Sequence, residues 1–126
     1  MRIVQPNIPQ DLKWNPRLRD QHLDKLVQLS KGAGEAGIKH IIWPETAIPF
    51  LVTPNTNLSS VIGNIIPAGG LLWAGSLTTA GDSESQLRLF NSLLILDDRG
   101  EVRAKYDKHH LVPFGEYIPF RDNFPF

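Results

Sequence analysis

The first half of the chain alternates between apolar runs and one segment with helical spacing. The apolar runs, residues 2–5 and 41–43, are rich in β-favouring side chains and predict two strands. Between them, apolar side chains recur every three or four residues and charged side chains take the opposite face, which predicts a helix. Asn15 and Pro16 suit the first positions of that helix, and Gly37 suits a left-handed cap after its end.

The second half carries shorter patterns separated by turn-forming residues. It predicts a loop to residue 54, a weak helix over 58–66 and a central strand over 71–76. An exposed turn over 78–86 should follow, and then strands over 87–96 and 101–105 joined by a hairpin turn at 97–100. Strand, helix, strand, helix, strand and hairpin is an α/β order with mixed strand pairing.

Composition narrows the class of protein. The 126 residues are 41% hydrophobic, which is enough for one small core. Thirteen basic residues balance thirteen acidic ones, so no overall field favours nucleic acid as a partner. The absence of cysteine excludes disulfides, zinc thiolate sites and a cysteine nucleophile within these residues. The sequence contains no run of 18 apolar residues, so it predicts no membrane span within these residues. Its first residues lack the apolar core of a signal peptide.

Residues 41–46, IIWPET, place a carboxylate where a buried strand should end. Pro44 has no N–H for the strand ladder and favours an extended residue before it, so Glu45 should lie just past the strand. Ligands of open α/β sheets bind at that edge. Beside Trp43 and Phe50, Glu45 should be partly desolvated, which would raise its pKa and suit it to proton transfer. The alternative is an ordinary solvated loop glutamate.

A second polar cluster lies in residues 105–117, KYDKHHLVPFGEY. Adjacent histidines in an extended chain point to opposite sides, and no helical HExxH spacing is present, so we predict ordinary loop histidines and no metal site. Lys108 is different because a lysine near a glutamate can supply a fixed positive charge for an oxyanion. The alternative is a surface cation with Glu116 as its partner.

Three blocks at this spacing resemble the carbon-nitrogen hydrolase (nitrilase) superfamily: WPET at 43–46, FNSL at 90–93 and YDKHHLVPFGEY at 106–117. Within it, QPNI at 5–8 with Trp14, and the segment 112–119, resemble the bacterial apolipoprotein N-acyltransferases. The resemblance runs over essentially the whole chain. It implies an α/β fold of the α-β-β-α sandwich type, of which residues 1–126 form an incomplete domain.

The resemblance also implies roles within a Glu-Lys-Cys triad. Glu45 matches the general base, Lys108 the lysine that stabilises the tetrahedral oxyanion, and Glu116 a second glutamate that supports the site. Trp14 lies in a loop expected near the substrate entrance. The nucleophile has no counterpart here, so we expect the chain to stop before the strand-to-helix elbow that carries the cysteine.

The reaction implied is transfer of an acyl chain from a phospholipid to the N-terminal amine of a diacylglyceryl-modified apolipoprotein, without metal or organic cofactor. The expected location is the periplasmic face of the bacterial inner membrane, held by flanking helices outside this sequence. Two alternatives remain: a soluble amidase or nitrilase of the same superfamily, and a non-catalytic binding fragment of that fold. Flanking apolar spans would favour the acyltransferase, and a downstream cysteine would favour an enzyme over a binding fragment.

Overall fold

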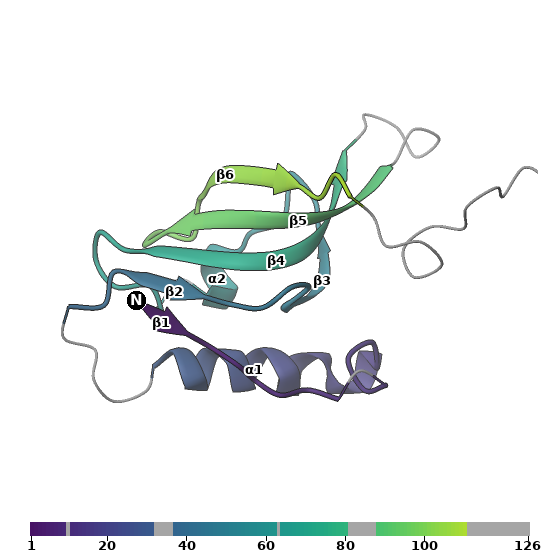
Figure 1. Cartoon of the computed structure of the whole chain (residues 1–126), viewed down its shortest axis with the longest axis horizontal. Coiled ribbons are helices and arrows are strands. Elements are labelled where there is room, and N and C mark those ends of the chain that lie inside the picture. Colours follow the sequence, from purple (N-terminus) through teal and green to yellow (C-terminus); the bar gives the residue numbers. More distant parts are fainter. Residues whose placement is uncertain (10, 32–36, 63, 81–87, 111–126) are drawn as a thin grey trace, which may run out of the picture.

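The computed structural model describes residues 1–9, 11–31, 37–62, 64–80 and 88–110. Its elements, in chain order, are β1 (Arg2–Ile3), the 3-10 turn η1 (Pro16–Leu18), α1 (Arg19–Ser30), β2 (His40–Ile42), β3 (Ile48–Val52), α2 (Ser59–Ile62), β4 (Leu71–Ala80), β5 (Arg88–Asp97) and β6 (Val102–Asp107). The strands form one mixed sheet, and α1 runs alongside it (Figure 1). None of the described helices has the length and hydrophobicity needed to cross a membrane.

Strand β4 organises the sheet, which has the order β1-β2-β4-β5-β6. One edge of β4 pairs along its whole length with antiparallel β5, and β6 follows as the next antiparallel strand. The other edge pairs first with parallel β2, which lies beside parallel β1, and then with parallel β3. The chain therefore leaves the edge of β4 after β2 and returns to it as β3, and the turn between them lies against the middle of β4.

Several predicted elements are confirmed. Ile41 and Ile42 of the apolar run at 41–43 lie in β2, with Trp43 directly after it, and the segments around the turn at 97–100 form the β5–β6 hairpin. The Asn15 side chain accepts a hydrogen bond from the Arg17 N–H at 3.0 Å, as expected of a helix start. Gly37 has the left-handed φ of +80° expected of it, but α1 already ends at Ser30.

Three predictions were wrong. The expected loop before residue 54 contains β3, because β3 is an edge strand and an edge strand tolerates Pro49. Residues 78–80 of the expected turn over 78–86 belong to β4, which stays paired with β5 as far as Ala80; residues 81–87 lie outside the described residues. The helix expected over 58–66 is only Ser59–Ile62, and the next backbone bond, from Ile65 N–H to Ile62 O, closes a turn instead of a helical step.

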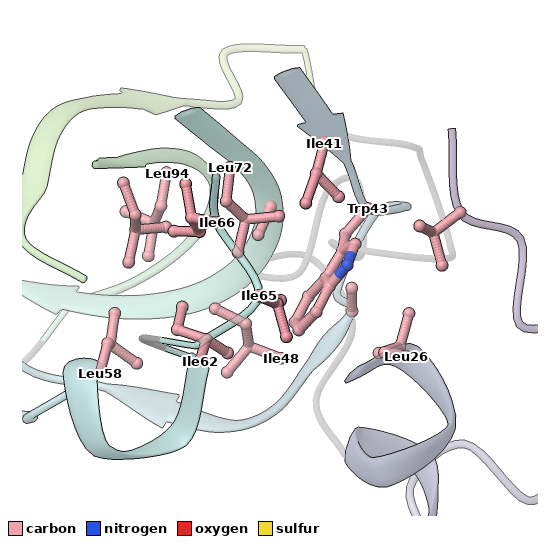
Figure 2. Packing of buried hydrophobic residues seen from close by; sticks show 14 of the residues in the cluster. Leu26, Ile41, Trp43, Ile48, Leu58, Ile62, Ile65, Ile66, Leu72 and Leu94 are labelled. Carbon is pink, nitrogen blue, oxygen red and sulfur yellow. The ribbon is translucent and has the colours of Figure 1, made fainter. Parts of the chain in front are cut away.

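The hydrophobic core lies between the sheet and its helices. Trp43, only 2% exposed, is at the end of β2, and Figure 2 shows its ring between the sheet and Leu26 of α1. Further buried side chains come from β4, β5, α2 and the segments next to α2, among them Leu58, Ile62, Ile65, Ile66, Leu72 and Leu94. This packing holds the end of β2 in place and so fixes where the following turn begins.

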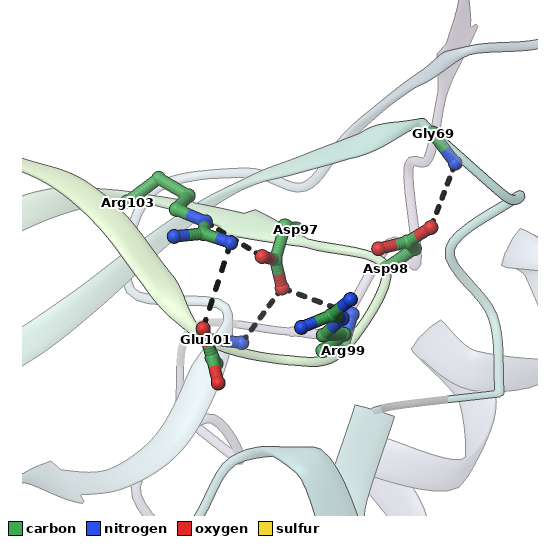
Figure 3. Close-up of polar contacts among 6 residues, drawn as sticks. All are labelled: Gly69, Asp97, Asp98, Arg99, Glu101 and Arg103. Carbon is green, nitrogen blue, oxygen red and sulfur yellow. Dashed lines mark hydrogen bonds and ion pairs between the residues drawn. The ribbon is translucent and has the colours of Figure 1, made fainter.

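Asp97 closes the β5–β6 hairpin (Figure 3). Its Oδ1 accepts hydrogen bonds from the main-chain N–H groups of Arg99 and Glu101, at 2.9 and 3.0 Å, and its Oδ2 accepts one from Arg103 Nε at 2.6 Å. Burial raises the pKa of Asp97, but these hydrogen bonds and the Arg103 charge outweigh it and leave the pKa below its usual range. The adjacent Asp98 accepts from the Gly69 N–H at 2.7 Å, which joins the hairpin to the loop before β4.

The lowered pKa of Asp97 predicts a pH-dependent contribution to stability. A carboxyl whose pKa is lower in the folded state stabilises the fold above its unfolded pKa of about 3.9, and this contribution is lost as the pH falls through the folded pKa. Asp97→Asn should therefore lower the urea midpoint at pH 7 and flatten its decline in acid. Asp98→Asn is the matched control. Equal acid sensitivity in wild type and Asp97→Asn would refute this role.

Candidate active site

The turn that bears Glu45 is pressed against the middle of β4. Trp43 N–H donates to Trp73 O at 2.8 Å, Gly75 N–H to Pro44 O at 3.2 Å, and Ala47 N–H to Gly75 O at 2.8 Å. A Cβ at Gly75 would lie 2.6 Å from the Pro44, Glu45 and Thr46 backbone, so only glycine admits this approach. Glu45 therefore projects from a turn that the strand beneath it holds by its backbone.

Trp43 anchors the same turn from the core side. Its indole Nε1 donates to Ser30 Oγ at 2.8 Å, and the Ser30 hydroxyl donates to Leu26 O at 2.7 Å. Ser30 is buried, so this short chain of hydrogen bonds satisfies the polar groups that the core encloses. The residue two positions before Glu45 is thus tied to the last turn of α1.

The structure brings Glu45 and Lys108 together from positions 63 residues apart in the sequence. Lys108 Nζ donates to Glu45 Oε1 at 3.0 Å, and Asn91 Nδ2 donates to the same oxygen at 2.6 Å. Asn91, on β5, also accepts the Lys108 main-chain N–H at 2.8 Å. One asparagine therefore contacts both the carboxylate and the backbone that carries the lysine.

Glu45 is not desolvated in the way that the sequence suggests. Its side chain is 60% exposed, against 32% for Lys108. The expected partial burial among Trp43 and its neighbours is wrong because the turn directs the carboxylate away from the core, toward β5 and the end of β6. Among the described residues, Asn91 and Lys108 both donate hydrogen bonds to Glu45 Oε1.

A second polar network lies beside Lys108. Asp107 Oδ1 accepts from Ser92 Oγ at 2.6 Å and pairs with Lys105 Nζ at 3.0 Å, and Ser92 Oγ lies 2.7 Å from Thr78 Oγ1. Burial raises the pKa of Asp107, but the Ser92 and Lys105 hydrogen bonds and the nearby Lys105 and His109 charges outweigh it and lower the pKa. Lys105 is thus engaged with Asp107, whereas Lys108 faces Glu45.

Glu45 lies between two open pockets. The first, which we call the entrance pocket, has a volume of about 240 Å³ and is lined by residues that include Lys13, Trp14, His22, Pro44, Glu45 and Pro49. The second also has a volume of about 240 Å³ and is lined by residues that include Pro44, Glu45, Gly75, Asn91, Tyr106 and Lys108. A substrate in either pocket would meet the Glu45 turn.

The structure places some of the other residues that the sequence analysis singled out, but not all of them. Trp14, 54% exposed, lines the same pocket as Glu45, and its place near a substrate entrance stays a prediction. Glu116 lies outside the described residues. The His109 ring packs edge-on against Tyr106, with centroids 5.4 Å apart. Within the described ranges, no three His, Cys, Asp or Glu side chains form a cluster suited to a metal ion.

Two residues at the site were not predicted to contribute. Asn91 belongs to the FNSL block, but a single asparagine in a strand carries no signal that it will contact a glutamate on a distant turn. Lys13, next to Trp14, donates from Nζ to the main-chain carbonyl of Glu45 at 3.0 Å. Its only sequence signal was its place beside Trp14, an aromatic residue in a predicted loop.

Comparison with known proteins gives a consistent family. The model of the carbon-nitrogen hydrolase family matches residues 1–125. The chain is 41% identical over 124 residues to an apolipoprotein N-acyltransferase of Brucella suis, covering 95% of this chain and 23% of that protein. A Sinorhizobium fredii apolipoprotein N-acyltransferase is 39% identical over 127 residues, covering 97% and 24%. The chain thus spans about a quarter of the length of these curated relatives.

Solved structures agree on the fold. A crystal structure of an N-terminal amidase with an Asn-Glu-Ala peptide has a TM-score of 0.58 at 18% identity, covering 87% of this chain and 28% of that one. A glutamine-dependent NAD+ synthetase from Acinetobacter baumannii has a TM-score of 0.53 at 20% identity, covering 76% and 19%. At these identities the likeness shows a shared fold alone, and the mixed sheet with its helices is the incomplete α/β sandwich expected from the sequence.

Proposed function

This chain belongs to the carbon-nitrogen hydrolase family, and on that basis we propose that it supplies the glutamate and the lysine of a Glu-Lys-Cys acyl-transfer centre. The observation that carries the proposal is the 3.0 Å contact between Lys108 Nζ and Glu45 Oε1. The chain contains no cysteine, so the nucleophile would come from a part of the enzyme outside these residues. Residues 1–126 would then form the early part of its catalytic domain.

The substrates proposed are those of the curated relatives, which are named apolipoprotein N-acyltransferases and are up to 41% identical to this chain. The enzyme would take an acyl chain from a phospholipid and attach it to the N-terminal amine of a diacylglyceryl-modified apolipoprotein. The donor is a phospholipid and the acceptor a lipid-modified protein, so we place the reaction at a membrane surface, on the periplasmic face of the bacterial inner membrane as the resemblance implies. The acyl ester is itself the activated donor, and the reaction needs no cofactor.

In the first half-reaction, the Glu45 carboxylate takes the proton of the cysteine thiol as sulfur attacks the ester carbonyl of the phospholipid. The tetrahedral oxyanion then accepts a hydrogen bond from Lys108. An ammonium has three N–H donors, so Lys108 can keep its bond to Glu45 while it donates to this oxygen. Glu45 returns the proton to the departing oxygen, lysophospholipid leaves, and the enzyme holds a thioester.

In the second half-reaction, the apolipoprotein amine attacks the thioester carbonyl. Lys108 holds the second oxyanion, and Glu45 takes a proton from the attacking nitrogen and gives it to the cysteine sulfur. The products are an N-acylated lipoprotein and the free thiol. Glu116, which lies outside the described residues, is proposed to support this site, and Trp14 to border the substrate entrance.

A fluorescent phospholipid and a diacylglyceryl lipopeptide test this function. The full-length protein should form the N-acyl lipopeptide, and a polypeptide of these 126 residues should form none because it has no thiol. Turnover by the 126-residue chain above a heat-killed control would contradict the assignment of the nucleophile. Hydrolysis of small amides without acyl transfer to the lipopeptide would favour the soluble amidase instead.

A further inference from the structure

The entrance pocket contains a lysine whose charge no described carboxylate balances. Lys13 Nζ donates to the main-chain carbonyl of Glu45, a neutral acceptor, at 3.0 Å. None of the ion pairs among the described residues includes Lys13. The acid that lines this pocket, Glu45, pairs through Oε1 with Lys108. An ammonium group with spare donors is therefore available to an anion in the pocket.

The rest of the pocket has a mixed lining. Its polar residues include Gln5, Asn7, His22 and Thr46, and its apolar ones include Pro6, Ile8 and Pro49. Trp14 also lines it and keeps 54% of its surface exposed, which is unusual for so large an aromatic residue. A cation beside exposed indole and aliphatic surface matches a ligand with one anionic group and adjoining hydrocarbon.

We propose that the entrance pocket binds the phosphodiester group of the phospholipid donor, with Lys13 contacting the phosphate. This inference rests on the proposed function and adds the residue that recognises the donor. Lysine binds phosphate as a point charge, and each ester of a glycerophospholipid lies only a few bonds from its phosphate. Because Lys13 is bonded to the backbone of Glu45, a phosphate on Lys13 keeps the ester near the proton acceptor. The amine of the apolipoprotein acceptor has no negative charge, so Lys13 offers it no such electrostatic attraction.

The test separates charge from shape with two non-reacting probes. One is the dihexyl diether analogue of phosphatidylmethanol, an anionic diester, and the other is its neutral methyl triester. Calorimetry on the full-length protein should show tighter binding of the diester. Lys13→Gln should reduce this preference about tenfold, since a hydrogen-bonded charge in an open pocket is lost, and Lys13→Arg should restore most of it. Lys25→Gln, a change at an exposed lysine of α1 that does not line the pocket, should change nothing.

Each outcome bears on a separate claim. An unchanged diester preference in Lys13→Gln would overturn the phosphate subsite, even if the enzyme still transfers acyl chains. Lys13-dependent diester binding without acyl transfer would keep the subsite and refute the proposed function. Inorganic phosphate distinguishes a lipid from a free anion: it should bind far more weakly than the diester, and equal binding would overturn the assignment to a lipid headgroup.

Discussion

Lys108→Met in the full-length enzyme should slow formation of the acyl-enzyme by about 100- to 1000-fold, the usual cost of removing one oxyanion donor. The structure gives the reason, because Lys108 Nζ lies 3.0 Å from the proposed general base and is only partly exposed. The fold should survive, since the Lys108 main-chain N–H keeps its bond to Asn91 O. Single-turnover kinetics with a fluorescent phospholipid measures the effect.

Two further lysine variants distinguish position from charge. Lys108→Arg keeps the positive charge but replaces a compact ammonium with a larger planar group, so it should restore little activity. Lys105→Met removes a nearby cation, on β6, that pairs with Asp107 instead of Glu45, so it should cost far less. If Lys108→Met kept a rate near wild type, or Lys105→Met were equally damaging, the oxyanion role of Lys108 would be wrong.

Glu45→Gln should lower the rate of both half-reactions by about 100- to 10,000-fold, the usual contribution of general acid-base catalysis. Glutamine has nearly the same shape, and its amide oxygen can still accept hydrogen bonds from Asn91 and Lys108, but it cannot take a proton. The loss would therefore reflect chemistry and not a displaced turn.

Glu101→Gln is the matched control for Glu45→Gln. Glu101 is an exposed glutamate whose carboxylate lies 3.6 Å from Arg103, away from the Glu45 turn. Its replacement should leave the acyl-transfer rate close to wild type. A Glu45→Gln enzyme as active as Glu101→Gln would show that another group takes the thiol proton.

The sequence predicted those parts of the fold in which local pattern and tertiary structure agree. Ile41 and Ile42 of the apolar run at 41–43 lie in β2, and the turn at 97–100 joins β5 and β6, because both have strong local signals. Strand β3 was missed because Pro49 signals a break, and only its pairing with β4 at an edge makes the strand possible. The length of β4 likewise depends on its partner β5 and not on its own polar residues.

The candidate site, like the fold, was predictable from the sequence only in part. Pro44 marks the end of β2, so the place of Glu45 after a strand could be read from the residues. Its proximity to Lys108 came only from the resemblance, because sequence spacing does not reveal which strands lie side by side. The Asn91 contact and the exposure of Glu45 depend on how the turn lies over Gly75, which is a property of the assembled sheet.

Intact mass spectrometry of the full-length protein tests the central claim most directly, because it detects the covalent intermediate itself. After incubation with phospholipid and no acceptor, wild type should gain the mass of one acyl chain, and hydroxylamine should remove it as expected of a thioester. Glu45→Gln and Lys108→Met should gain almost none in the same time. An unmodified wild-type protein, or equal acylation of all three proteins, would contradict a Glu-Lys-Cys acyl-transfer centre built on this chain.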